Sequence, residues 1–567
     1  MTPAALDGEP GAPYRYLEAE PSAAGTGDND LSGRYADMKF DFDWLVIGSG
    51  FGGSVSALRL AEKGYSVGVL ERGRRFRDED LAESAWQLGR FLWAPILGLK
   101  GVMRMRVFGH VFFPSQSAVG GGSTVYGGVL YRARDKFFED AQWRGLGDWA
   151  RELRPHYEKA ERMLGVRTVP FTSTNQRLAL SMARHFGRED GFALSPTGVY
   201  FGDPGVTVKD PFFGGQGPDR TGCTRCGSCM VGCRTGAVNT LTKNYLWFAE
   251  KLGVQIKAER EVVDVQPIGA ADGSEGYQVT TQRPGAWFDR DRQVHTARGV
   301  VLAGGTLGTN ELLANCKLGG SLPRISDRLG DLVRTNSESV LNVRLPTDME
   351  TWKDVTASSC VRLDDETQIE FLTYGRRADL MGMMYTLLVG KGNRVTRPLK
   401  WLSAITRHPV QWLKTLWPFG WSRHMVTLLV MQTLDNAIAL RPKKRWLGGG
   451  WRVVTDQNRA RPNPTYIDVA NEATQWLARH TGGIAQSNIV EALADIPTTA
   501  HVLGGAVIGA DALSGVVDRR LRIFGYKNML VCDGSAMPAN PGVNPALTIT
   551  ALAECAMSHV PPNTEHT

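Results

Sequence analysis

Four cysteines lie close together in the sequence at spacings that suit redox or metal chemistry. Cys223, Cys226, Cys229 and Cys233 follow the pattern C-x2-C-x2-C-x3-C. Thiolates at such short separations hold iron–sulfur clusters or zinc. Arg234 stands where the usual iron–sulfur motif has a proline, and no second copy of the motif occurs. The segment therefore predicts either a metal site, for which an iron–sulfur cluster is the leading candidate, or a cysteine-rich turn with free thiols.

A glycine motif near the front of the chain indicates dinucleotide binding. An apolar run enters residues 48–53, which form a G-x-G-x-x-G turn, and Glu71 closes the next apolar run. In this motif Gly48 permits a tight turn, Gly50 lets the backbone approach a pyrophosphate, and Gly53 lets a helix pack against the strand. The helix N-terminus attracts phosphates. Because Glu71 suits a ribose 2′-OH and would repel a 2′-phosphate, the sequence predicts FAD or NAD rather than NADP.

The elements that must position these motifs follow an α/β pattern. Residues 119–128 contain five glycines, which would let the backbone lie against a flat ligand such as an isoalloxazine ring. Apolar runs at 254–256, 261–265 and 299–306 predict further strands of the nucleotide sheet. From about residue 325 to 495, alternating apolar stretches suggest a separate sheet with covering helices.

Length and composition describe an ordinary globular protein. The chain has 567 residues, of which 42% are hydrophobic and 22% charged, enough for two or three folding units. A net charge of +7 without a dense basic run argues against nucleic acid as a partner. The sequence shows neither a secretory signal nor an apolar stretch long enough to span a membrane. With only eight cysteines, we expect a cytoplasmic protein, in contact with the inner membrane face if it binds membranes.

The C-terminal segment carries a family resemblance. Residues 501–505 read H-V-L-G-G, and residues 542–545 read G-V-N-P. Together with residues 48–53 and 120–123, these elements resemble the glucose-methanol-choline (GMC) flavin oxidoreductase family, and within it the cholesterol oxidase branch. The likeness covers most of residues 42–558. It implies bound FAD and an α/β fold, in which a Rossmann-like FAD-binding domain accompanies a discontinuous α+β substrate domain with a mixed sheet covered by helices.

The expected domain boundaries follow from this resemblance. They are a disordered leader at 1–38, FAD-binding segments at 39–165, 223–325 and 496–560, and substrate-binding segments at 166–222 and 326–495.

The resemblance also assigns site residues. His501 matches the family's catalytic histidine, and a histidine suits a base that takes a hydroxyl proton near neutral pH. Asn544 matches the asparagine that contacts substrate oxygen and flavin, and Glu370 aligns with a glutamate that moves a proton during double-bond isomerisation. An exposed strand glutamate is the alternative for Glu370. The expected cofactor-binding residues are Gly48, Gly50, Phe51, Gly52, Gly53, Glu71, Gly121, Gly122, Ser123, Val262, Asp533, Gly534, Asn544, Pro545 and Ala546.

One segment bears on where a substrate would come from. Between residues 397 and 425 the chain has Trp401, Trp412, Trp417 and Trp421 among leucines and basic residues. Tryptophan beside cations suits a membrane interface. The alternative is an ordinary helical cover on the substrate sheet.

We therefore expect FAD-dependent oxidation of a hydrophobic secondary alcohol. The leading substrate is a 3β-hydroxysteroid such as cholesterol, converted to the 3-ketosteroid with or without double-bond isomerisation, and the acceptor is O2 or an electron carrier. One alternative is a dehydrogenase for another large apolar lipid alcohol, which would pass electrons through an iron–sulfur cluster to a quinone or carrier. Another is a flavoprotein that only transfers electrons.

Overall fold

The nucleotide sheet begins at the strand expected from the sequence. In the computed structural model, which describes residues 39–444, 450–457 and 461–564, strand β1 (Phe42–Ile47) leads into helix α1 (Phe51–Glu62), and β2 (Val67–Leu70) follows. Strand β1 lies between β2 and β15 (Gln293–Leu302) and runs parallel to both. Gly64 follows α1 with a φ of 84°, the left-handed conformation typical of a glycine that ends a helix.

This first sheet has seven strands in the order β12-β2-β1-β15-β14-β13, and β26 also pairs with β15. The remaining strands are β12 (Gln255–Lys257), β13 (Glu261–Pro267), β14 (Tyr277–Gln282) and β26 (Met529–Val531). Strands β12, β2, β1, β15 and β26 are parallel, so their carboxyl ends meet at one edge, where ligands bind in such folds.

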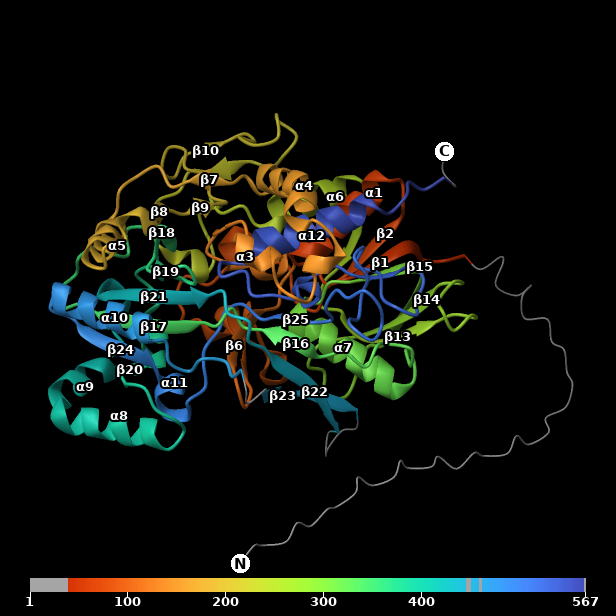
Figure 1. The fold of residues 1–567 in the computed structure, drawn as a ribbon. Coiled ribbons are helices and arrows are strands. Elements are labelled where there is room, and N and C mark those ends of the chain that lie inside the picture. Colours follow the sequence, from red (N-terminus) through yellow and green to blue (C-terminus); the bar gives the residue numbers. More distant parts are fainter. Residues whose placement is uncertain (1–38, 445–449, 458–460, 565–567) are drawn as a thin grey trace, which may run out of the picture. The chain divides into compact units, whose positions relative to one another are not determined.

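Helices cover the nucleotide sheet. They are α4 (Trp149–Leu164), α6 (Tyr245–Lys251), α7 (Gly305–Gly319) and α12 (Ala546–Ser558). Helix α1 contacts α6 and α12, and α12 contacts α4, so these four helices form one layer (Figure 1). Helix α7 contacts β13 instead.

A second sheet of seven strands has the order β20-β24-β17-β21-β19-β18-β8. Its strands are β8 (Phe192–Leu194), β17 (Ser339–Arg344), β18 (Ala357–Arg362), β19 (Thr367–Leu372), β20 (Tyr385–Leu387), β21 (Met425–Gln432) and β24 (Ile484–Asn488). Helices α5 (Thr174–His185) and α10 (Asp468–Thr481) contact it (Figure 1). We expected a mixed sheet, but all these pairings are antiparallel. Short connections such as that between β18 and β19 favour antiparallel neighbours.

A smaller sheet contains the H-V-L-G-G segment. Its order is β23-β22-β16-β25, with strands β16 (Asp331–Arg334), β22 (Ile438–Lys444), β23 (Trp451–Gln457) and β25 (Leu503–Gly505). Strand β25 comes directly after Val502 and pairs with β16, so the H-V-L-G-G segment forms the edge of this sheet.

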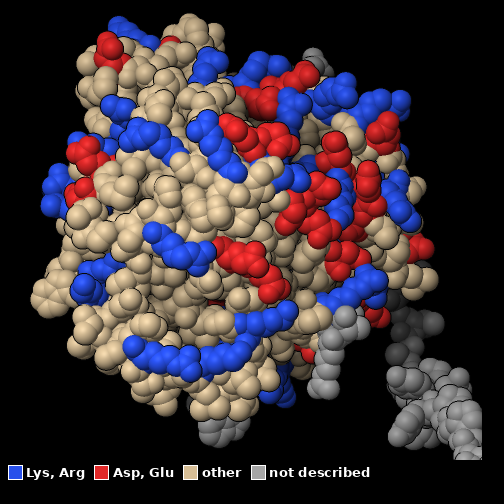
Figure 2. Space-filling model, turned by 60° about the vertical axis from the view of Figure 1, so that its left-hand side comes forward, with Lys and Arg blue, Asp and Glu red and all other residues tan. Residues whose placement is uncertain are grey.

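Two helices, α8 (Thr396–Arg407) and α9 (Pro409–Leu416), contact β20 at the edge of the second sheet. Figure 1 shows them at the lower left. Figure 2 brings that side forward, and its lower part is mostly tan and blue, whereas most red side chains gather on the right.

The described residues from Phe40 onward form one compact unit by their contacts. The division into FAD-binding and substrate-binding domains stays a prediction. The predicted leader, residues 1–38, lies outside the described residues.

Candidate active site

A large cavity connects the nucleotide sheet to the second sheet. Its volume is about 2150 Å³. Thirteen of the expected cofactor-binding residues line it: Gly48, Gly50, Phe51, Gly52, Glu71, Gly121, Gly122, Val262, Asp533, Gly534, Asn544, Pro545 and Ala546. The three expected catalytic residues, His501, Asn544 and Glu370, line it as well. The structure thus brings residues that are hundreds of positions apart in the sequence to the walls of one space.

The glycine turn fits a bound dinucleotide. A Cβ atom on Gly48 would lie 2.3 Å from the carbonyl oxygen of Ala303, and one on Gly53 would lie 2.1 Å from the carbonyl oxygen of Gly48. These glycines are therefore required by close backbone packing. A Cβ atom on Gly50 would meet nothing within 4 Å, because this position faces the cavity. Gly50 is also the N-cap of α1 and offers no side chain to its free N–H groups, which suits a diphosphate there.

Glu71 is held in place by hydrogen bonds at both carboxylate oxygens. Its Oε2 accepts hydrogen bonds from the backbone N–H of Ser49 at 3.0 Å and from the hydroxyl of Ser49 at 2.8 Å, and its Oε1 accepts one from the N–H of Gly73 at 2.8 Å. These contacts fix the carboxylate at the end of β2, on the cavity wall.

Ser123 has another role than the expected contact with the cofactor. It is fully buried, its hydroxyl donates to the carbonyl of Gly120 at 2.7 Å and accepts from the N–H of Leu241 at 3.0 Å, and it does not line the cavity. Ser123 therefore shapes the glycine loop, and Gly121 and Gly122 present that loop to the cavity.

Asp533, which lines the cavity, organises the surrounding backbone. Its carboxylate accepts hydrogen bonds from the N–H of Gly305 at 2.9 Å, the hydroxyl of Thr309 at 2.5 Å and the N–H of Ser535 at 2.8 Å. Burial raises the pKa of Asp533, although these hydrogen bonds oppose the shift. The residue thereby ties α7 to the segment after β26.

His501 is paired with a glutamate that the sequence analysis did not identify. Its Nδ1 contacts Oε1 of Glu338 directly. The other carboxylate oxygen of Glu338 accepts hydrogen bonds from the N–H of Ala500 at 2.6 Å and the hydroxyl of Thr499 at 2.8 Å. Because Nδ1 is engaged, Nε2 is the ring nitrogen left for the cavity that His501 lines.

This pairing changes the basicity of the imidazole. Burial by itself lowers the pKa of His501, but the Glu338 carboxylate outweighs it and raises the pKa above its ordinary value, with Glu370 adding to the effect. Glu338 is 1% exposed, so water does little to screen the pair. The arrangement gives a stronger base whose proton-accepting nitrogen has a fixed direction.

Glu370 and Asn544 meet on the same cavity wall. The amide of Asn544 donates to Oε2 of Glu370 at 3.4 Å, and its Oδ1 is buried without a hydrogen-bond partner among the described residues. Glu370 is fully buried on β19, which excludes the exposed strand position that was the alternative. Burial raises the pKa of Glu370 to about 7, although the nearby His501 lowers it. The pair thus offers an acceptor without a donor and a carboxyl group that is partly protonated near neutral pH.

Asn336 lies between the Glu338 carboxylate and the loop at residues 542–545. Its amide nitrogen donates to Oε1 of Glu338 at 3.2 Å and to the carbonyl of Val543 at 3.0 Å, and its Oδ1 accepts from the N–H of Gly542 at 2.9 Å. The loop that carries Asn544 and the carboxylate that holds His501 are therefore connected by a single buried side chain.

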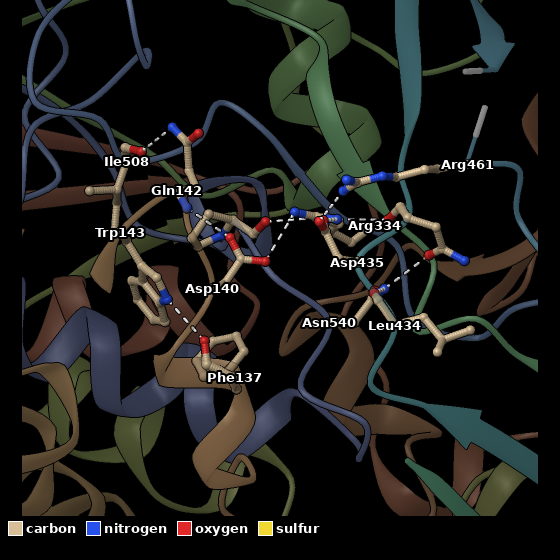
Figure 3. Close-up of polar contacts among 12 residues, drawn as sticks. Phe137, Asp140, Gln142, Trp143, Arg334, Leu434, Asp435, Arg461, Ile508 and Asn540 are labelled. Atoms are coloured by element: carbon tan, nitrogen blue, oxygen red, sulfur yellow. Dashed lines mark hydrogen bonds and ion pairs between the residues drawn. The ribbon is translucent and has the colours of Figure 1, made fainter. Parts of the chain in front are cut away.

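A buried arginine supports this junction from β16. The guanidinium of Arg334 donates to the carbonyl of Pro538 at 2.7 Å and pairs with Asp435 at 2.9 Å and Asp140 at 3.2 Å (Figure 3). These partners come from the nucleotide-binding region and from the segment after β21. Figure 3 also shows Asn540 donating to the carbonyl of Leu434, at 2.7 Å, beside this cluster. The contacts of Arg334 fix the chain just before residues 336–338.

Comparison with known proteins identifies the family. A GMC oxidoreductase family model matches residues 452–553, and an NAD(P)-binding Rossmann-like domain model matches residues 46–77. A cholesterol oxidase of Acinetobacter baumannii is 43% identical over 528 residues, which cover 92% of this chain and 95% of that protein. The chain belongs to the GMC oxidoreductase family. A cholesterol oxidase of Mycobacterium tuberculosis (strain ATCC 25618 / H37Rv) is 44% identical over 533 residues, which cover 92% of this chain and 91% of its own.

Membership of the GMC family confirms three predictions: the family itself, FAD as cofactor and an alcohol oxidoreductase as the class of enzyme. A solved structure, pyridoxine 4-oxidase from Mesorbium loti, matches with a TM-score of 0.58 at 14% identity, covering 93% of this chain and 99% of that one. This likeness confirms the fold. The individual roles of His501, Asn544 and Glu370 stay predictions.

The cysteine segment of this GMC protein gives no support to the predicted iron–sulfur cluster. Among the described residues, which include Cys223, Cys226, Cys229 and Cys233, no group of three or more His, Cys, Asp or Glu side chains is placed to hold a metal ion. Cys229 and Cys233 are buried in an apolar cluster that includes valines 169, 199, 238 and 355. Burial also raises the pKa of Cys223 to about 12. The arrangement fits free thiols, two of which pack in an apolar core.

Within the described part of the chain, every helix is too short or too polar to cross a bilayer.

Proposed function

We propose that this protein oxidises the 3β-hydroxyl group of a sterol such as cholesterol to the 3-ketone, with O2 as the final acceptor. The 43–44% identity to two cholesterol oxidases over 92% of the chain supports this substrate class and acceptor. The observation that carries the proposal is the arrangement of His501, held by Glu338, beside the unpaired Oδ1 of Asn544 on the wall of the FAD cavity. A protein that only relayed electrons would need neither group.

Each side chain has a defined task in this proposal. Bound FAD supplies the hydride acceptor of the reaction at its N5 atom. Nε2 of His501 accepts the hydroxyl proton as the carbon–hydrogen bond breaks, and the resulting imidazolium is stabilised by the Glu338 carboxylate. The amide group of Asn544, on the same cavity wall, orients the substrate oxygen, while the single hydroxyl hydrogen points to Nε2 of His501.

Glu370 suits the isomerisation step. A carboxyl group with a pKa of about 7 can accept a proton from the carbon next to a ketone and return it to another carbon at neutral pH. Its position beside Asn544 puts it next to the oxidised carbon. We therefore assign the migration of the double bond, from the 5,6 to the 4,5 position of the steroid, to Glu370.

Anaerobic flavin bleaching tests the substrate. We expect a 3β-hydroxysteroid to bleach the visible flavin absorbance of the purified holoenzyme, because the hydride passes to the coenzyme. The 3α-epimer and long-chain primary alcohols should bleach it at least about tenfold more slowly, since only the 3β-epimer presents its C–H bond correctly. Readmission of O2 should restore the colour and release peroxide. Bleaching by a long-chain alcohol but by no steroid would contradict the substrate assignment, and restoration only by an added carrier would contradict O2 as acceptor.

We further propose that α8 and α9 contact an anionic membrane surface. Helix α8 is held to the protein by polar groups: buried Arg397 pairs with Asp495 at 3.2 Å, and Trp401 donates to the hydroxyl of Thr386 at 2.8 Å. The apolar side chains point to solvent instead. Among them are Val395, Leu399, Leu402, Val410, Leu413, Leu416, Trp417 and Phe419, all more than half exposed. A helix that faces the protein with polar groups and solvent with apolar side chains suits insertion into the headgroup region of a membrane.

Charge supports the same surface. Residues 380–434 contain seven Lys or Arg and no Asp or Glu; apart from Arg397, which is buried against Asp495, these cations would attract anionic lipids. The surface adjoins the cavity, because Arg394, just before α8, donates to the carbonyl of Gly109 on the cavity wall. Of the tryptophans expected at the interface, Trp417 is 62% exposed, but Trp421 is buried against Tyr385 and cannot contribute. Trp401 and Trp412 are half-buried.

Vesicle co-sedimentation tests the surface. We expect the holoenzyme to bind vesicles of phosphatidylcholine mixed with phosphatidylglycerol, and the triple variant Leu402→Ser, Leu413→Ser, Trp417→Ser to bind about tenfold less tightly, because it loses the apolar contacts. A matched triple variant, Val206→Ser, Leu252→Ser, Leu513→Ser, changes equally exposed side chains elsewhere and should bind like the wild type. Equal loss in both variants, or no binding by the wild type, would contradict this surface.

A further inference from the structure

An arginine on a hairpin faces the FAD cavity without a partner of opposite charge. Strand β5 (Met103–Val107) pairs with β6 (Phe112–Gln116), and the hairpin forms part of the cavity wall. Arg104 lines the same cavity as Gly50, Glu71 and Val262, which are predicted to hold the ADP part of FAD. No carboxylate among the described residues lies within ion-pair distance of its guanidinium.

The charges around Arg104 leave a local excess of positive charge. Arg106, two residues further on β5, pairs with Glu311 at 3.6 Å. Arg72, which follows Glu71, donates only to the neutral hydroxyl of Ser117 at 3.0 Å. Burial, together with Arg72 and Arg106, lowers the pKa of Arg104 to about 9, although the more distant carboxylates of Glu311 and Glu261 oppose the shift. Clustered guanidinium groups in a partly buried place are costly unless an anion joins them.

We propose that Arg104, assisted by Arg72, binds the diphosphate of FAD. The diphosphate is the anionic part of FAD, and the open space at Gly50 and the N-terminus of α1 are on the same cavity. A guanidinium can make two parallel hydrogen bonds to phosphate oxygens, which are stronger than bonds between neutral groups. The hairpin would thereby close over the coenzyme, which adds a binding contact to those of the glycine motif.

Coenzyme affinity tests this role independently of turnover and of the sterol. The dissociation constant of FAD is measured from the rise in flavin fluorescence when the holoenzyme is diluted. We expect Arg104→Met to raise it by about tenfold or more, because charged hydrogen bonds to the diphosphate are lost. Arg104→Lys should raise the dissociation constant less, since a lysine keeps the positive charge but cannot make the two parallel hydrogen bonds of a guanidinium.

Arg106→Met is the matched control on the same strand. It removes an arginine that Glu311 already neutralises, so the dissociation constant should change less than about threefold. Arg104→Met should show wild-type far-UV circular dichroism and melting temperature at saturating FAD. Unchanged FAD affinity in Arg104→Met, equal losses in Arg104→Met and Arg106→Met, or an unfolded Arg104→Met at saturating FAD would each overturn the proposal. The last two outcomes would mean that Arg104 supports the hairpin and does not bind the diphosphate.

Discussion

His501→Asn is expected to slow flavin reduction by the sterol about 10²- to 10⁴-fold while the protein keeps its FAD. The substitution removes the nitrogen that takes the hydroxyl proton, so the hydride would have to leave from a neutral alcohol. Stopped-flow measurement of flavin bleaching under anaerobic conditions reports this step directly. His501 does not belong to the glycine turn or to the contacts of Glu71, so the visible spectrum and the FAD content should match the wild type.

His156→Asn is a suitable control for this experiment. His156 is a half-buried histidine on α4 that does not line the cavity, and its replacement should leave the rate of flavin reduction unchanged. If His501→Asn reduced its flavin as fast as the wild type, His501 would not be the base. Loss of FAD from the variant would show instead that the residue supports the cofactor site.

The cofactor end of the site was largely predictable from the sequence, because its features are local. Gly48, Gly53 and Glu71 lie within one βαβ unit, and backbone packing at the strand-to-helix turn dictates their spacing. Thirteen of the fifteen expected cofactor-binding residues line the cavity. Ser123 and Gly53 do not line it. The hydroxyl of Ser123 donates to its own loop, and Gly53 packs closely against the backbone of Gly48.

The catalytic end was predictable only in part. His501 and Asn544 were recognised from short motifs, whereas Glu338 and Asn336 lie in a polar run that reads as an exposed turn. The structure buries both side chains, because each satisfies its hydrogen bonds with groups from distant segments. A single sequence carries no periodic signal for such pairings, since the partners meet only after two sheets and the C-terminal loops have packed together.

The cysteine pattern shows the reverse case. The sequence spacing suggests a metal site, but the described residues form no group of side chains placed to hold a metal ion. The spacing of the four thiols suits a cluster, but the fold buries Cys229 and Cys233 in an apolar core and leaves Cys226 exposed. Likewise, Trp421 belongs to a Trp-rich segment but fills the core beside Tyr385. Residue type and spacing alone do not report which way a side chain faces.

Glu338→Gln is expected to slow flavin reduction by about 100-fold and to move its pH dependence. The neutral imidazole of His501 is the base, so the rate should rise with pH through the pKa of His501. Since Glu338 raises that pKa, its replacement should shift the midpoint of the rise to lower pH. The plateau should fall as well, because the base is weaker and the amide group would face the N–H of Ala500, disturbing the ring's orientation.

Two further variants separate this positioning role from general damage to a buried site. Glu338→Asp keeps the negative charge on a shorter arm and should recover part of the rate with a midpoint nearer that of the wild type. Glu491→Gln changes another buried glutamate, which accepts from Ser339 and Thr498, the neighbours of Glu338 and Thr499, but does not contact His501. It should leave the midpoint unchanged. A midpoint that stays fixed in Glu338→Gln, or that moves equally in Glu491→Gln, would show that Glu338 does not set the basicity of His501.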